Sequence, residues 1–150
     1  KNFQSGMMAV RQIEFSLFDM QLHSEFDPKS VLTVMNLLNE VRKEVAVLTP
    51  PEWHRFPNSF SHIFGGGYGA GYFSYKWAEV LSADAYAAFE EAAKAGGDST
   101  LDVATGRRYR AAILEAGGSR PAMESFKAFR GREPTLDALL RHQGMTAEAA

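Results

Sequence analysis

The chain has 150 residues, of which 45% are hydrophobic and 23% are charged, a length and composition that suit one globular domain with one core. Its net charge of −2 argues against a nucleic-acid-binding protein, which normally carries a strong basic excess. The sequence contains no cysteine, which excludes disulfides and thiolate metal sites. It also contains no apolar run that approaches the roughly 20 residues of a membrane span.

The first third of the chain predicts two helices and a proline-rich connection. It begins "KNFQSGMMAV", with neither an initiator methionine nor the layout of a signal peptide, so we expect it to be part of a longer protein. Apolar residues near a 3.6-residue period predict a long helix over residues 6–23. A second helix is predicted from Val31 to Val45, with Asp27 as its N-cap and Pro28 in its first turn. Three prolines in "TPPEWHRFPNS" predict an extended connection without regular structure.

The second half predicts a run of helices with short joints. "YFSYKWAEVLSADAYAAFEEAAKA" predicts a helix over residues 72–95, which Gly96 and Gly97 would end. Three shorter helices are predicted after it, with these caps or opening residues: Ser99 or Thr100, then Ser119, then Pro134 with Thr135. Because no stretch alternates with period two for long enough to form a strand, the sequence predicts an all-α domain of about six helices.

The most unusual segment is "SHIFGGGYGAGYFSYKW", residues 61–77, with five glycines and three tyrosines. A dinucleotide-binding loop needs G-x-G-x-x-G after a strand, whereas the glycines here follow G-x-G-x-G with no predicted strand before them. Lys76 also does not stand in the frame of a P-loop. The spacing therefore disfavours phosphate binding.

The tyrosines of this segment admit two interpretations. Tyr68, Tyr72 and Tyr75 stand at i, i+4 and i+7, so on a helix they would share one face. Such a stripe can pack in a core or against a partner helix, as in a non-catalytic interaction module. Alternatively, a phenol hydroxyl can donate a hydrogen bond to a developing oxyanion, and a hinge at residues 65–67 can close the loop over a bound chain. The pattern alone leaves both interpretations open.

The histidines do not form a recognisable metal site. His54 and His62 are eight positions apart, with Pro57 as a helix breaker between them, which is not a zinc-ligand spacing. The sequence contains no H-E-x-x-H, no G-x-S-x-G and no cysteine nucleophile. The residues by themselves therefore reveal no complete catalytic centre.

"FSHIFGGGYGAGYFSYKWAEVLSADAYAAFEE" resembles the C-terminal part of the thimet oligopeptidase and oligopeptidase A family of zinc metallopeptidases. The opening "KNFQSGMMAVRQIEFSLFDMQLH" and the end "GRRYRAAILEAGGSRPAMESFKAFRGREPTLDALLRH" resemble the same proteins. The resemblance implies that residues 1–150 are the C-terminal helical part of the catalytic domain of a cytoplasmic enzyme that hydrolyses short peptides. It implies zinc ligands upstream of Lys1, so this chain would bind no metal itself. Its partners would be peptide substrates and the upstream zinc-binding segment, without nucleic acid or membrane.

The resemblance also implies two catalytic residues. His62 matches a histidine that contacts the substrate or the tetrahedral intermediate, and Tyr75 matches a tyrosine that donates to the oxyanion. A tyrosine, whose ordinary pKa is about 10, stays protonated at neutral pH and can make that donation.

Four further residues are implied as substrate-binding: Tyr68, Tyr72, Gly66 and Gly67. Tyr68 lies on the loop that would close over the peptide, the glycines belong to that flexible loop, and Tyr72 would line the channel. Phe73 departs from a position that is often tyrosine in the family, so a hydroxyl is missing there. Because the channel face would be exposed in this chain, we also expect it to self-associate or to exchange a helix.

Overall fold

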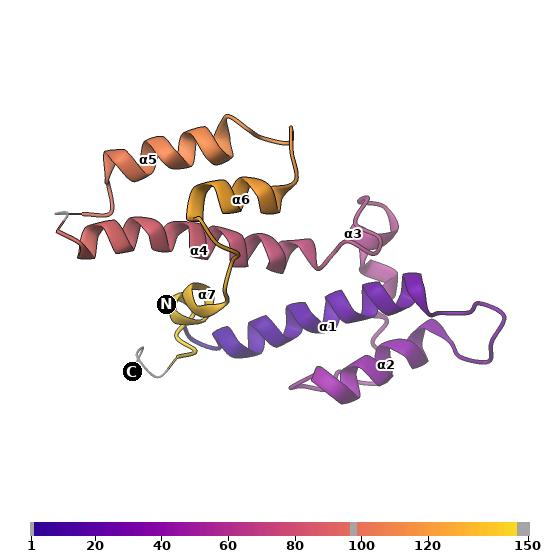
Figure 1. Cartoon of the computed structure of the whole chain (residues 1–150). Helices are drawn as coiled ribbons and strands as arrows, with labels where there is room; N and C mark the ends of the chain where they lie inside the picture. Colours follow the sequence, from indigo (N-terminus) through magenta and orange to yellow (C-terminus); the bar gives the residue numbers. More distant parts are fainter. Residues whose placement is uncertain (1, 97–98, 147–150) are drawn as a thin grey trace. The chain divides into compact units, whose positions relative to one another are not determined.

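The computed structural model describes residues 2–96 and 99–146. Within these ranges every regular element is a helix, which confirms the predicted all-α class (Figure 1). The chain divides into two compact units, residues 1–76 and 77–150, each with buried apolar residues of its own where one core was expected. No helix of the described ranges is long and apolar enough to cross a membrane. The predicted helix end at Gly97 lies outside the described residues.

The first unit is built on two helices that lie side by side, α1 (Ser5–Ser24) and α2 (Val34–Val45) (Figure 1). The α1 bounds confirm the helix predicted over residues 6–23. Phe18 of α1 and Leu38 of α2 are fully buried, and burial of one such side chain contributes roughly 1.5–3 kcal/mol. The buried members of this core are Phe15, Phe18, Leu37, Leu38, Phe60, Ile63 and Tyr72.

The start of α2 was predicted wrongly. Thr33, not Asp27, is the N-cap: its hydroxyl accepts from the Asn36 N–H at 3.1 Å, while Asn36 accepts from the Thr33 N–H. This reciprocal pair satisfies two otherwise unpaired amides of the first turn. Asp27 instead accepts the Lys29 N–H at 2.9 Å in a local turn, and Val31 is fully exposed.

The proline-rich connection contains one regular element that the sequence did not predict. It ends in a short 3₁₀ helix, η1 (Phe56–Ser59), with a buried Pro57 in its first turn, where the missing N–H is not needed. The ring of Phe56 stacks on Phe15 of α1 with the centroids 4.5 Å apart. This stacking attaches the connection to the core that carries the following helix, α3 (Ser61–Phe64).

In the second unit, apolar residues of α4 (Ser74–Lys94) face two groups of neighbours. On one side, Ala85 and Ala88 pack with residues of α5 (Val103–Tyr109), of the π-helical turn η2 (Arg110–Leu114), and of α6 (Ala122–Arg130). On the other side, Ala83 and Ala87 pack against α7 (Asp137–His142). Alanine lets each neighbour approach the α4 backbone closely, because its side chain is a single methyl group.

The predicted caps of the shorter helices were wrong, although the helices exist. Asp102, not Ser99 or Thr100, caps α5 by accepting the Thr105 N–H at 2.6 Å. The α6 helix follows Pro121 and has no side-chain cap, so Ser119 does not fill that role. The last helix begins at Asp137, two residues after Thr135, whose hydroxyl donates to the Asp137 carboxylate.

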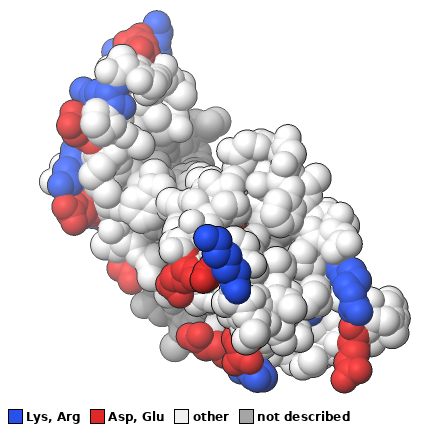
Figure 2. Space-filling model, turned by 90° about the vertical axis from the view of Figure 1, so that its right-hand side faces the viewer, with Lys and Arg blue, Asp and Glu red and all other residues white. Residues whose placement is uncertain are grey.

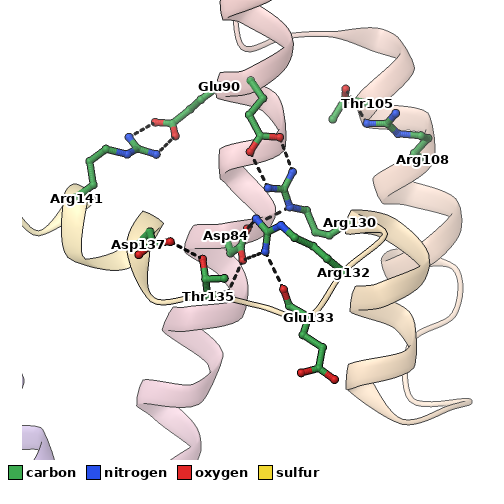
Figure 3. Close-up of polar contacts among 11 residues, drawn as sticks. Asp84, Glu90, Thr105, Arg108, Arg130, Arg132, Glu133, Thr135, Asp137 and Arg141 are labelled. Atoms are coloured by element: carbon green, nitrogen blue, oxygen red, sulfur yellow. Dashed lines mark hydrogen bonds and ion pairs between the residues drawn. The ribbon is translucent and has the colours of Figure 1, made fainter.

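A buried carboxylate organises the end of the second unit. Asp84 of α4 is 1% exposed and accepts two hydrogen bonds from Arg132 at 2.7 Å, one from Arg130 at 3.1 Å and one from the Thr135 N–H at 2.8 Å (Figure 3). Burial alone would raise the pKa of Asp84, but the bonds from Arg132 and Thr135 outweigh it and hold the pKa below its ordinary value. This network fixes the segment between α6 and α7 to α4.

Charges of the two signs are mixed on the surface. On the face shown in Figure 2, Lys and Arg side chains lie beside Asp and Glu side chains, with uncharged residues between the groups. Exposed pairs such as Lys127 with Glu133, 2.7 Å apart, contribute little to stability because water and salt screen both charges.

Candidate functional site

The first unit gathers the histidine and the three tyrosines that the sequence singled out. His62 lies on α3, Tyr75 lies in the first turn of α4, and the other two tyrosines lie in the turns between these helices. The His62 ring centroid is 6.1 Å from that of Tyr68, 5.5 Å from Tyr72 and 6.1 Å from Tyr75. The rings of Tyr68 and Tyr75 stack at 5.2 Å. We call these four side chains the His62 cluster.

The tyrosines do not form a helical stripe, which corrects the sequence prediction. Residues 65–73 are turns and bends, with bonds from the Gly71 N–H to the Tyr68 carbonyl and from the Ser74 N–H to the Gly71 carbonyl. Glycine disfavours a helix, and Ala70 has a left-handed φ of 54°, which no right-handed helix accommodates. The tyrosines meet because the turns fold the chain back on itself.

Two glycines of the loop have a geometric reason to be glycine. A Cβ added at Gly66 would lie 2.9 Å from the His62 carbonyl oxygen, which is closer than real Cβ atoms approach backbone. Gly67 has a φ of 78°, which side chains rarely adopt. The loop thus lies tightly against the His62 backbone, and its action as a hinge stays a prediction.

The hydroxyls of the cluster differ in their surroundings. Tyr68 and Tyr75 are 37% and 40% exposed, and His62 is exposed as well. The pKa of Tyr75 is raised mainly by the hydrogen bond between the hydroxyls of Tyr68 and Tyr75, and to a smaller extent by partial desolvation. The Tyr75 phenol is therefore neutral at physiological pH. Tyr72 is only 8% exposed; burial raises its pKa, and its hydroxyl donates to Gln12 at 2.9 Å. The cluster therefore presents the hydroxyls of Tyr68 and Tyr75 to solvent around the buried ring of Tyr72.

The sequence reasoning missed Asp19, which joins α1 to this loop. The Asp19 side chain is 1% exposed and accepts the N–H groups of Ala70 and Tyr72, each at 2.9 Å. A signal was available: Asp19 continues the apolar stripe of Phe15 and Leu22 at helical spacing, so an acid stands at a core position. A buried carboxylate needs partners, and here they are backbone amides.

Among residues 2–96 and 99–146, no three His, Cys, Asp or Glu side chains come together as a group that could hold a metal ion.

Within the described residues, the chain is all-α and carries the exposed His62 cluster beside a glycine loop. The model of peptidase family M3 matches residues 1–145, and the chain belongs to this family. Oligopeptidase A of Haemophilus influenzae is 52% identical over 97% of the chain, and that of Salmonella typhimurium is 50% identical over the same share. Saccharolysin of Saccharomyces cerevisiae is 32% identical over 97% of the chain. The chain spans only about 20% of the length of each of these relatives.

Proposed function

We propose that the chain is the C-terminal, substrate-binding part of a zinc metallo-oligopeptidase that hydrolyses short peptides. Membership of peptidase family M3 and the similarity to proteins named oligopeptidase A support a peptide-hydrolysing parent enzyme. The observation that carries the proposal for this chain is the His62 cluster, which holds exposed neutral donors next to an imidazole.

In this proposal Tyr75 is the oxyanion donor. As water adds to the scissile carbonyl, negative charge gathers on its oxygen, and a neutral phenol placed there stabilises the transition state by roughly 3 kcal/mol. The raised pKa of Tyr75 favours this role, because the proton must stay on the phenol until the oxyanion forms. His62, whose ring centroid is 6.1 Å from that of Tyr75, contacts the substrate or the tetrahedral intermediate.

The remaining loop residues bind the peptide. Tyr68 closes over it, while Gly66 lets the loop lie close to α3 and Gly67 supplies a left-handed φ of 78°. The hydroxyl of Tyr72 is bonded to Gln12, which holds its ring in place, and Tyr75 packs on this ring at a centroid distance of 5.2 Å.

Zinc belongs to the proposal only for the parent enzyme, where it would polarise the carbonyl and activate water. Its ligands are assigned to the upstream segment on the resemblance to the family alone. The roles assigned to this chain are accordingly limited to binding, orientation and hydrogen-bond donation. A cytoplasmic location stays a prediction.

The test is Tyr75→Phe in the full-length enzyme, assayed on a short quenched peptide. We expect kcat to fall roughly a hundredfold with KM little changed, as for a bond made mainly in the transition state. The control is Tyr86→Phe, another half-exposed tyrosine, which lies in the second unit outside the cluster. An unchanged kcat in Tyr75→Phe would instead support the packing interpretation of the tyrosines, as in an interaction module.

A further inference from the structure

We propose that Asp19 is a positioning residue, whose buried carboxylate sets the conformation of residues 69–72 and thereby the placement of Tyr68 and Tyr75. This inference rests on the proposed function for its catalytic consequence. Its structural part, that Asp19 holds the loop, concerns only contacts within the first unit.

The carboxylate is bonded on both oxygens. Oδ1 accepts the Ala70 N–H at 2.9 Å and lies 2.9 Å from His23 Nδ1, while Oδ2 accepts the Tyr72 N–H at 2.9 Å. His23 Nδ1 also lies 2.8 Å from the Asp19 carbonyl oxygen, so both of its neighbours are acceptors and Nδ1 must carry the hydrogen. The carboxylate thus has three donors, and two of them, the N–H groups of Ala70 and Tyr72, belong to the loop.

Ala70 shows what this arrangement holds in place. Its φ of 54° is left-handed, a conformation that costs free energy for any residue with a Cβ. Such a conformation persists only where the surroundings enforce it. Ala70 is itself exposed, so its methyl group gains nothing from burial, whereas its N–H is bonded to Asp19.

The loop transmits this constraint to the donors of the cluster. Tyr72 donates a hydrogen bond to α1 at each end, from its N–H to Asp19 and from its hydroxyl to Gln12. Tyr75 packs on Tyr72 at 5.2 Å and stacks on Tyr68 at the same distance. If residues 70–72 relax, the Tyr72 ring moves with them, and so do the Tyr75 ring that packs on it and the Tyr68 ring that stacks on Tyr75.

The same helix offers a matched control. Glu14 of α1 is also buried, but its carboxylate accepts from Arg42 Nε of α2 at 3.0 Å and has no bond to the loop. Glu14→Gln and Asp19→Asn each remove one buried negative charge from α1. Both changes should lower stability, but only Asp19→Asn should disturb the loop.

The experiment uses the full-length enzyme with two readouts: kcat on a short quenched peptide, and hydrogen exchange of a peptide spanning residues 68–75 by mass spectrometry. In Asp19→Asn one N–H of the loop faces an amide donor instead of an acceptor. We expect faster exchange of this peptide and a kcat about ten- to a hundredfold lower, as small misplacements of catalytic groups cause. Glu14→Gln should leave both readouts near their wild-type values.

A rescue and a second variant separate positioning from general damage. Ala70→Gly in the Asp19→Asn background should recover part of kcat, because glycine adopts the left-handed conformation without strain. Ala70→Val, at an exposed position, should copy Asp19→Asn even if that variant folds poorly, because a β-branched residue resists a positive φ.

The outcomes decide the inference separately from the proposed function. Unchanged exchange in Asp19→Asn, or unchanged kcat where Tyr75→Phe lowers it, would overturn the positioning role. If Tyr75→Phe leaves kcat unchanged, the proposed function fails, and faster exchange in Asp19→Asn would still support Asp19 as the anchor of the loop.

Discussion

Replacing Asp84 by asparagine should destabilise the second unit more than any surface change. Its carboxylate is 1% exposed and receives two bonds from Arg132, one from Arg130 and one from the Thr135 N–H. Breaking a buried ion pair by neutralising one partner costs about 3–5 kcal/mol. We expect the lower end of that range, because the Arg132 side chain is 42% exposed and water can solvate its charge afterwards. The Arg130 side chain is only 6% exposed, so water solvates its charge much less.

The assay is urea denaturation of the chain followed by circular dichroism, with Glu91→Gln as the control. Glu91 pairs with the same Arg130 at 2.7 Å but is 61% exposed, so its loss should cost less than about 1 kcal/mol. In thermal melts, 3 kcal/mol corresponds to a Tm lower by roughly 6–12 °C for a chain of this length. Equal losses of unfolding free energy in the two variants would refute the reasoning that burial decides the contribution.

The pH dependence of stability, compared between wild type and Asp84→Asn, gives an independent check. Because the folded-state pKa of Asp84 lies below its ordinary value, its ionised form stabilises the fold above about pH 3.9, and this contribution is lost as pH falls through the folded-state pKa. The difference in unfolding free energy between wild type and Asp84→Asn should therefore be constant near neutral pH and shrink in acid. A difference that grows below pH 4 would contradict the assignment.

Three further predictions concern the glycines and the surface. Gly66→Ala in the full-length enzyme should lower kcat about tenfold, because the new Cβ lies 2.9 Å from the His62 carbonyl oxygen and shifts the loop. Its control is Gly118→Ala, where the new Cβ has no atom within 4 Å. Gly106→Ala, inside α5 and equally uncrowded, should raise the unfolding free energy by about 1 kcal/mol. Because large apolar side chains such as Trp53 are exposed, the chain should self-associate, and a monomer mass by light scattering at high concentration would contradict this.

The long helices could be predicted because many residues agree on one face. In α1 the apolar positions repeat over more than four turns, and burial of Phe15 and Phe18 confirms the face they define. The ends of helices could not be predicted as well, because each depends on a competition between neighbouring polar side chains. Thr33 and not Asp27 is the N-cap of α2, because Asn36 stands three residues later and bonds to it reciprocally. Asp102 and not Ser99 is the N-cap of α5, because its carboxylate accepts an N–H of the first turn.

The candidate site shows the same division. The residue types of the His62 cluster could be named from the sequence, but not the turns that bring Tyr68, Tyr72 and Tyr75 together, since those depend on the backbone at Ala70. Asp19 could not be assigned because its partners are backbone amides 51 and 53 residues away, which leave no side-chain pattern. Only its place on an apolar stripe marked it as unusual.

The two hydrogen bonds from Tyr72 to α1 also constrain the spacing between their acceptors on that helix, Gln12 and Asp19. Gln12 and Asp19 are seven residues apart, so their positions differ by about 10.5 Å along the axis and by only about 20° around it. Deleting one residue between them would rotate one anchor by about 100° relative to the other. Exposed positions in this stretch, such as Ile13, should accept other side chains, whereas the number of residues between the two anchors should not change. Insertions and deletions should therefore be absent from this stretch wherever the loop keeps its present form.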